Sequence, residues 1–118
     1  MKIAVLTSGG DAPGMNACVR AVVRSAIHYG FEAYGVYNGY KGLFENKIVQ
    51  LGRNDVGQIL NRGGTILGSS RLESFKQKEV RQIAVDNLKK LEIDALVVIG
   101  GDGTYRGGME LNDMGINV

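Results

Sequence analysis

The sequence predicts an α/β domain of three layers, an open and mostly parallel sheet with helices on both faces. Two continuous apolar runs, residues 3–6 and 95–99, are typical of parallel strands that are covered on both sides. Each run leads into a loop rich in glycine with one aspartate, and a helical pattern follows each loop. Strands that alternate with helices in this way favour a parallel sheet with helices packed against it.

The first half of the chain predicts a helix at residues 15–29, a strand at residues 31–37 and a turn cluster at residues 38–42. Gly30 is a typical stop signal for the helix. The helix face that we expect to be buried consists of pairs that recur at three-to-four spacing: Ala17 with Cys18, Ala21 with Val22, and Ser25 with Ala26.

The second half predicts two longer helices and two smaller elements. Residues 47–51 favour a short strand outside the main sheet, and Asp55 is placed to cap a brief helix that extends to Leu60. The clearest helix covers residues 77–91, because its apolar residues form one stripe and its last turn is basic. A final helix is expected at residues 105–114.

Composition excludes several classes of function. A net charge of +2 without a basic block argues against nucleic-acid binding, which needs a concentrated positive field. The apolar runs are too short to span a bilayer, and the first residues lack the layout of a signal peptide. A single cysteine, Cys18, allows no disulfide framework and is expected to be a small buried group. A cytoplasmic protein of one domain, with neither nucleic acid nor membrane as a partner, is therefore expected.

Two glycine- and aspartate-containing loops predict a phosphate site. Residues 8–11 and 100–104 both follow apolar strands, and a parallel sheet brings the carboxyl ends of its strands to one edge. Backbone amides of Gly10 and of Gly101 to Thr104, with a helix N-terminus behind them, suit a polyphosphate. Asp102 is then placed to hold a hard cation. The alternative is an ordinary glycine-rich turn in which Asp102 is the N-cap, but the pairing of the two loops favours phosphate binding.

Basic residues outside the loops suggest further roles. Arg71 ends a loop of small residues and could supply the cation that phosphoryl transfer requires, although a hydrated loop arginine has the same pattern. Arg20 and Arg24 repel each other at four-residue spacing, a cost that an anion would reverse, and a hydrated helix face is the simpler alternative. His28 fits a role at the helix end. The loops lack both the P-loop and the dinucleotide-binding spacing of glycines, so other motifs must identify the ligand.

Four ordered segments, residues 3–16, 38–42, 61–68 leading to Arg71, and 95–104, resemble the bacterial ATP-dependent 6-phosphofructokinases. The resemblance covers essentially the whole chain and implies a phosphofructokinase-like fold, in which residues 1–118 form the amino-terminal, ATP-binding part of the large domain. It also implies an enzyme of glycolysis that uses Mg²⁺ to transfer the γ-phosphate of ATP to fructose 6-phosphate, giving fructose 1,6-bisphosphate.

By position, the resemblance implies roles for individual residues. Asp102 would hold the magnesium, Arg71 would stabilise the transition state, and Gly103 would favour ATP because relatives that use pyrophosphate tend to carry aspartate there. The implied ATP-binding residues are Gly10, Tyr40, Arg71, Leu72, Gly101, Asp102, Gly103, Thr104 and Gly107. An allosteric site for ADP or phosphoenolpyruvate, between subunits of a homotetramer, would involve Arg20, Ala21, Val22, Val23, Arg24, Arg53, Asn54, Asp55, Val56, Gly57 and Gln58. Gln58 differs from those relatives that carry an acidic residue at this position.

The family's catalytic base lies on a Thr-Ile-Asp-Asn-Asp motif, which would follow Val118 together with most ligands of the sugar phosphate. The 118 residues alone are therefore expected to be inactive, since the acceptor hydroxyl needs a positioned base. Two alternatives remain open at this point. NAD kinases and diacylglycerol kinases share the Gly-Gly-Asp-Gly-Thr turn, and a short chain of this kind could also be an isolated nucleotide-binding module.

Overall fold

The computed structural model describes residues 1–8, 14–56, 66–69 and 72–118. Its strands form one sheet in the order β3-β2-β1-β4. The central strand β1 (Lys2–Thr7) pairs in parallel with β2 (Glu32–Val36) on one side and with β4 (Ala95–Ile99) on the other. At the edge, β3 (Ile48–Leu51) runs antiparallel to β2. The sheet is therefore mixed but mostly parallel, as predicted.

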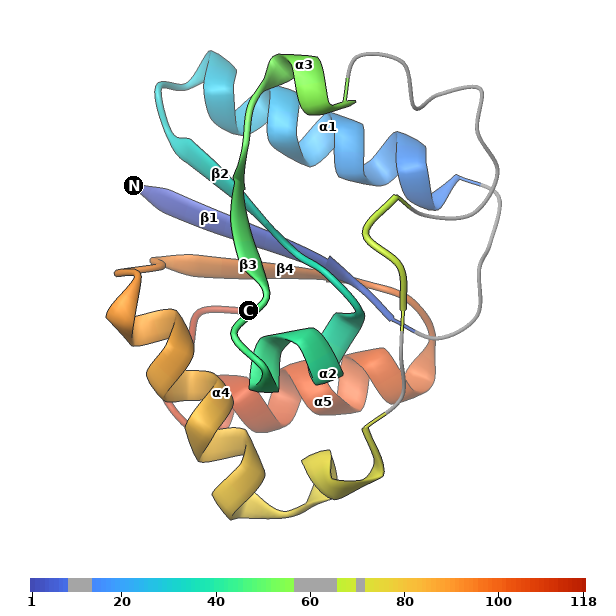
Figure 1. The fold of residues 1–118 in the computed structure, drawn as a ribbon, viewed down its shortest axis with the longest axis vertical. Coiled ribbons are helices and arrows are strands. Elements are labelled where there is room, and N and C mark those ends of the chain that lie inside the picture. Colours follow the sequence, from blue (N-terminus) through green and yellow to red (C-terminus); the bar gives the residue numbers. More distant parts are fainter. Residues whose placement is uncertain (9–13, 57–65, 70–71) are drawn as a thin grey trace.

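Helices cover both faces of this sheet (Figure 1). On one face lies α1 (Met15–His28), with the short α3 (Arg53–Val56) packed beside it. The other face carries α2 (Gly39–Phe44), α4 (Lys78–Lys90) and α5 (Asp102–Asp113). This arrangement confirms the predicted three-layer α/β fold.

Alternating side chains of the strands build two cores, one on each face of the sheet. On β1, Ala4 and Leu6 pack toward the α2, α4 and α5 side, whereas Val5 packs toward α1. The same alternation separates Leu96 from Val97 on β4. Because side chains alternate along a strand, a continuous apolar run supplies both cores at once. This is why residues 3–6 and 95–99 were recognisable as central strands.

The buried face of α1 differs from the predicted one. Its buried residues are Met15, Asn16, Val19, Val23 and Ala26, and Ala17 and Ala21 are exposed. Cys18 is exposed as well, so the prediction of a small buried thiol was wrong. Small residues occur on several sides of this helix, so their spacing fits more than one buried face. The face that carries the valines is the buried one, because valine removes more apolar surface from water than alanine or cysteine does.

Other corrections concern element boundaries. Residues 48–51 belong to the main sheet as an edge strand rather than lying outside it. The predicted turn at residues 38–42 is mostly the helix α2. The last helix begins at Asp102, three residues before the predicted start, and the amide of Tyr105 donates to the carbonyl of Gly101 at 3.0 Å. A glycine-rich first turn has low intrinsic helix propensity, which concealed this start in the sequence.

Three further segments, η1 (Glu73–Lys76), α4 and α3, complete the fold. The 3₁₀ turn η1 leads into α4, which begins and ends within one residue of the prediction. In α3, the carboxylate of Asp55 accepts the amide of Gly52 at 2.6 Å, so Asp55 supports the helix start from inside the first turn instead of preceding the helix. The continuation of that helix toward Leu60 lies outside the described residues. Within the described part of the chain, no helix combines the length and apolar character that a membrane span needs.

Candidate functional site

The strand order places a topological switch between β1 and β4. The chain moves from β1 to β2 on one side and returns to β4 on the other, so the loops that leave β1 and β4 diverge to opposite faces. The amide of Ser8 donates to the carbonyl of Ile99 at 3.0 Å, which holds the two loops together. A Cβ on Gly100 would overlap the Ser8 carbonyl and the Thr104 side chain. Only glycine allows this approach, and the predicted meeting of the two loops is confirmed as far as Ser8.

A cavity of about 630 Å³ opens beside this junction. Its wall brings together the residues that the sequence assigned to ATP and that the structure describes: Tyr40, Leu72, Gly101, Asp102, Gly103, Thr104 and Gly107. Two others, Gly10 and Arg71, lie outside the described residues. Residues from α2, η1 and α5 therefore converge on one concavity, although they are up to 67 positions apart in the chain (107 − 40).

The N-terminus of α5 forms one wall of this cavity. Gly101 is the N-cap and has an extended backbone, so Asp102 is the first helical residue and not the N-cap of the simpler interpretation. A Cβ on Gly101 or on Gly103 would meet no atom within 4 Å. The first amides of a helix lack acceptors within that helix, and the helix dipole makes this end attractive to anions. The geometry is that of an anion site with open space in front of it.

Thr104 adds a polar group behind these amides. Its side chain is almost completely buried, and its hydroxyl oxygen has no hydrogen-bond partner among the described residues. A buried hydroxyl without a partner is costly, and such groups concentrate at sites that receive a partner from a ligand or from solvent.

Tyr40 joins three walls of the cavity. Its hydroxyl donates to the carbonyl of Thr104 at 2.5 Å, and its ring stacks on Phe75 with 4.5 Å between centroids. Gly107 makes room for the ring, since a Cβ there would lie 2.7 Å from it. Burial raises the pKa of Tyr40 well above that of a free tyrosine, because the buried phenolate would lose its hydration, and a backbone hydrogen bond from Gly108 opposes this only in part.

Replacing Tyr40 with phenylalanine should change how stability responds to alkaline pH. The unfolded chain loses the tyrosine proton near pH 10, whereas folded Tyr40 retains it, so the folded state binds more protons and stability falls as pH rises above about 10. In Tyr40→Phe this part of the alkaline decline should disappear. Urea denaturation of both proteins between pH 8 and 11 measures it, with Tyr29→Phe, at an exposed tyrosine, as the control. Parallel declines in all three proteins would contradict the assignment.

The sequence analysis missed a second set of cavity residues. Arg81 of α4 donates through Nη1 to the carbonyls of Phe75 at 3.0 Å and Lys76 at 2.7 Å, and its Nη2 lies 3.6 Å from a carboxylate oxygen of Glu110. Arg81 thereby ties η1 and α5 to α4. The residues missed in the cavity wall are Glu73, Phe75, Lys76, Arg81, Arg106 and Glu110, whereas Ser8 belongs to the predicted loop at residues 8–11. Only Phe75, an aromatic residue within a charged segment, gave a signal that could have been noticed.

The residues predicted to bind an effector lie on the opposite face of the sheet. Residues 20–24 belong to α1 and residues 53–56 form α3, which packs beside it, so the structure does bring the two predicted segments together (Figure 1). Their side chains differ in accessibility. Val23 is completely buried in the core and Val22 packs partly against it, whereas Arg24 and Arg53 are exposed. Gly57 and Gln58 lie outside the described residues.

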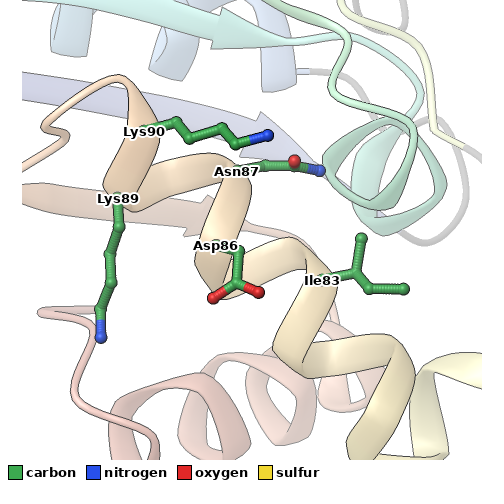
Figure 2. A pocket seen from close by; sticks show the side chains of 5 residues that line it. All are labelled: Ile83, Asp86, Asn87, Lys89 and Lys90. Carbon is green, nitrogen blue, oxygen red and sulfur yellow. The ribbon is translucent and has the colours of Figure 1, made fainter.

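A second cavity, of about 550 Å³, lies on α4 and is lined by Ile83, Asp86, Asn87, Lys89 and Lys90 (Figure 2). The two lysines point in different directions, so their charges do not converge on one point. Asn87 instead points toward α2. Among the described residues, no charged cluster for a ligand is therefore assembled at this second cavity.

An open α/β sheet with a cavity at its switch point, walled by a glycine-rich helix N-terminus, has the architecture that many α/β proteins use to bind phosphate-bearing ligands beyond their strand ends. Comparison with known proteins identifies the family to which the chain belongs. The chain belongs to the phosphofructokinase family, whose model matches residues 2–118.

Individual relatives agree with this assignment. The chain is 61% identical over 115 residues to an ATP-dependent 6-phosphofructokinase of Buchnera aphidicola, covering 98% of this chain and 36% of the relative. It is also 61% identical over 114 residues to the protein of that name from Vibrio campbellii, with coverages of 97% and 36%. The phosphofructokinase structure from Saccharomyces cerevisiae superposes with a TM-score of 0.92 at 47% identity, covering 95% of this chain and 15% of that one. The chain thus spans about a third of the length of the curated relatives.

Proposed function

We propose that this chain is the ATP-binding part of a cytoplasmic ATP-dependent 6-phosphofructokinase, which transfers the γ-phosphate of ATP to the 1-hydroxyl of fructose 6-phosphate in glycolysis. The observation that carries the proposal is the cavity in which the N-terminus of α5 faces the stacked rings of Tyr40 and Phe75. It combines an anion site and an aromatic surface within one concavity, as a nucleotide requires. The 61% identity to relatives that bear this name supports the choice of reaction.

The positions of the cavity residues suggest which part of the nucleotide each of them contacts. The amides of Gly103 and Thr104 and the Thr104 hydroxyl suit the phosphates, because they are donors at the positive end of a helix. Leu72, which is partly exposed, and the small exposed parts of Tyr40 and Phe75 at the cavity wall offer apolar surface to the base. Gly10 and Arg71 complete the proposed phosphate contacts, and Arg71 supplies the charge that stabilises the transition state.

Magnesium fits this donor set through Asp102. The carboxylate is exposed on the first turn of α5 and borders the cavity. In the described residues no group of three or more metal-binding side chains occurs. A single carboxylate is nevertheless the usual protein contribution to a magnesium ion that rides on substrate phosphates and keeps its waters. When bound, the ion neutralises charge that develops on the phosphates.

The remaining parts of the proposed function lie further from the cavity. The catalytic base and most sugar-phosphate ligands would come from residues beyond these 118, so the segment alone should not phosphorylate sugars. ADP or phosphoenolpyruvate would bind beside α1 and α3, where Arg24 and Arg53 are exposed, at an interface within a homotetramer. The side chain of Val23 would take no part in that contact because it lies in the core.

The test is a substrate panel on the full-length protein. We expect phosphorylation of fructose 6-phosphate with MgATP, little with pyrophosphate as the donor, and none of NAD or diacylglycerol. Phosphorylation of NAD or of a lipid, with fructose 6-phosphate inert, would overturn the proposal. MgATP binding without transfer to any acceptor would favour a nucleotide-binding module instead.

A further inference from the structure

Asn87 fastens the carboxyl end of α2 to α4. Its side-chain amide nitrogen donates to the carbonyl of Leu43 at 2.9 Å and to that of Phe44 at 3.1 Å. Figure 2 shows the side chain reaching from α4 toward α2. The last carbonyls of a helix lack donors within that helix, so these bonds act as a cap supplied from another element. Only 8% of Asn87 is exposed, so water cannot readily replace it.

The helix that receives this cap is short and depends on its neighbours. α2 has six residues, too few for a helix to be stable by itself. Its N-cap, Asn38, has a left-handed backbone with φ of 65°. Leu43, the penultimate residue of α2, is completely buried and anchors the carboxyl-terminal half of the helix in the core. The position of α2 is therefore set by contacts from outside the helix.

The other end of α2 reaches the nucleotide cavity. Tyr40, in its first turn, donates to the carbonyl of Thr104 at 2.5 Å and stacks on Phe75. The Thr104 carbonyl belongs to the first turn of α5, whose amides face the proposed phosphates. A displacement of α2 along its axis would move the Tyr40 hydroxyl away from Thr104, while Asn87 itself does not line this cavity.

We propose that Asn87 is a positioning residue for the nucleotide cavity, acting through α2 and Tyr40 on the first turn of α5. The structural part of this inference stands on the hydrogen bonds alone, and its consequence for nucleotide affinity rests on the proposed function. The competing explanation is that Asn87 only stabilises the fold. The two differ in what they predict at the first turn of α5, which Asn87 reaches through α2 and Tyr40, whereas the direct ion pair between α4 and α5 joins Arg81 to Glu110, two turns further along α5.

The first test measures hydrogen exchange in the full-length protein without ligand. In Asn87→Leu, which keeps the branched side-chain shape and removes the donor, the amides of α2 and the amide of Tyr105, which closes the first turn of α5 on the Gly101 carbonyl, should exchange about tenfold faster. The matched control is Asp86→Leu, at the preceding and exposed position of the same helix. It should leave both segments unchanged. Faster exchange in α2 with no change in α5 would overturn the proposal.

The second test measures binding. Asn87→Leu should weaken MgATP binding about tenfold, since small misplacements of positioning groups are costly, and should change the KM for fructose 6-phosphate by less than about twofold. In a Tyr40→Phe background the same substitution should have little further effect, because coupled residues are not additive. Additive effects of the two substitutions would overturn the proposal.

A folding defect in the Asn87 variants is a separate possible result of these tests. Asn87→Asp has the same shape and directs an oxygen at the two carbonyls, so it serves as the second variant if Asn87→Leu does not fold. If neither variant folds, Asn87 is a residue of the fold and the positioning role is refuted. Failure of the wild-type protein to bind MgATP would refute the proposed function, while the exchange experiment would still decide the link from Asn87 to α5.

Discussion

Replacing Asp102 with asparagine should lower the kcat of sugar phosphorylation about a thousandfold, the scale of effect seen when one group that stabilises transition-state charge is removed. The carboxylate is the proposed magnesium ligand of the cavity, and asparagine keeps its shape while losing the charge. The fold should be little affected. Asp102 is exposed at the start of α5, where losing a favourable interaction with the helix dipole costs about 0.3–1 kcal/mol. The measurement is kcat in the full-length protein as a function of Mg²⁺ concentration.

The control for this change is Asp113→Asn. Asp113 is the last residue of α5, exposed, and on the opposite end of the same helix. It should alter kcat by less than about twofold, because the helix dipole acts only within the terminal turns and a carboxylate at the last turn is slightly unfavourable. A variant at Asp102 with wild-type kcat and an unchanged magnesium requirement would contradict the role as metal ligand.

The sequence predicted the central part of the fold because its physical causes are local. Residues 95–99 are apolar without interruption, since β4 supplies Leu96 to one core and Val97 to the other. The helix α4 was placed within one residue because its stripe is regular and its ends are polar. The meeting of the two glycine loops followed from the rule that parallel strands share a carboxyl edge. These predictions required no knowledge of contacts between distant residues.

The missed features depend on such distant contacts. Arg81 gives no signal in the sequence, because its ion pair with Glu110 joins two helices that are separate in the chain, and its bonds to the carbonyls of Phe75 and Lys76 depend on how η1 turns into α4. The helix α2 contains two glycines in six residues and forms because Leu43 is buried and Asn87 caps it. Tertiary packing therefore overrides a propensity for a turn. The cavity residues assigned from the family resemblance were brought together, but their chemical roles stay predictions.

Replacing Gly103 with aspartate should raise the KM for ATP about a hundredfold or more, since like charges brought close together in a binding site cost several kcal/mol. Gly103 is the second residue of α5, exposed and bordering the cavity, and a Cβ there would meet no atom within 4 Å. The new carboxylate would thus enter the space in front of the helix N-terminus without disturbing the fold. It would occupy the proposed phosphate site with charge of the same sign.

The comparison with Gly103→Ala separates charge from bulk. Alanine adds one methyl group at an unobstructed position and should raise the KM for ATP less than about fivefold, roughly the value of a small apolar group in a binding pocket. Both variants should unfold at or slightly above the wild-type temperature, because alanine improves helix propensity and aspartate favours the first turn. The ratio of ATP to pyrophosphate use should fall in Gly103→Asp, since a smaller donor leaves room for the added carboxylate. Equal KM values for ATP in the two variants would show that the space before Gly103 does not hold the phosphates.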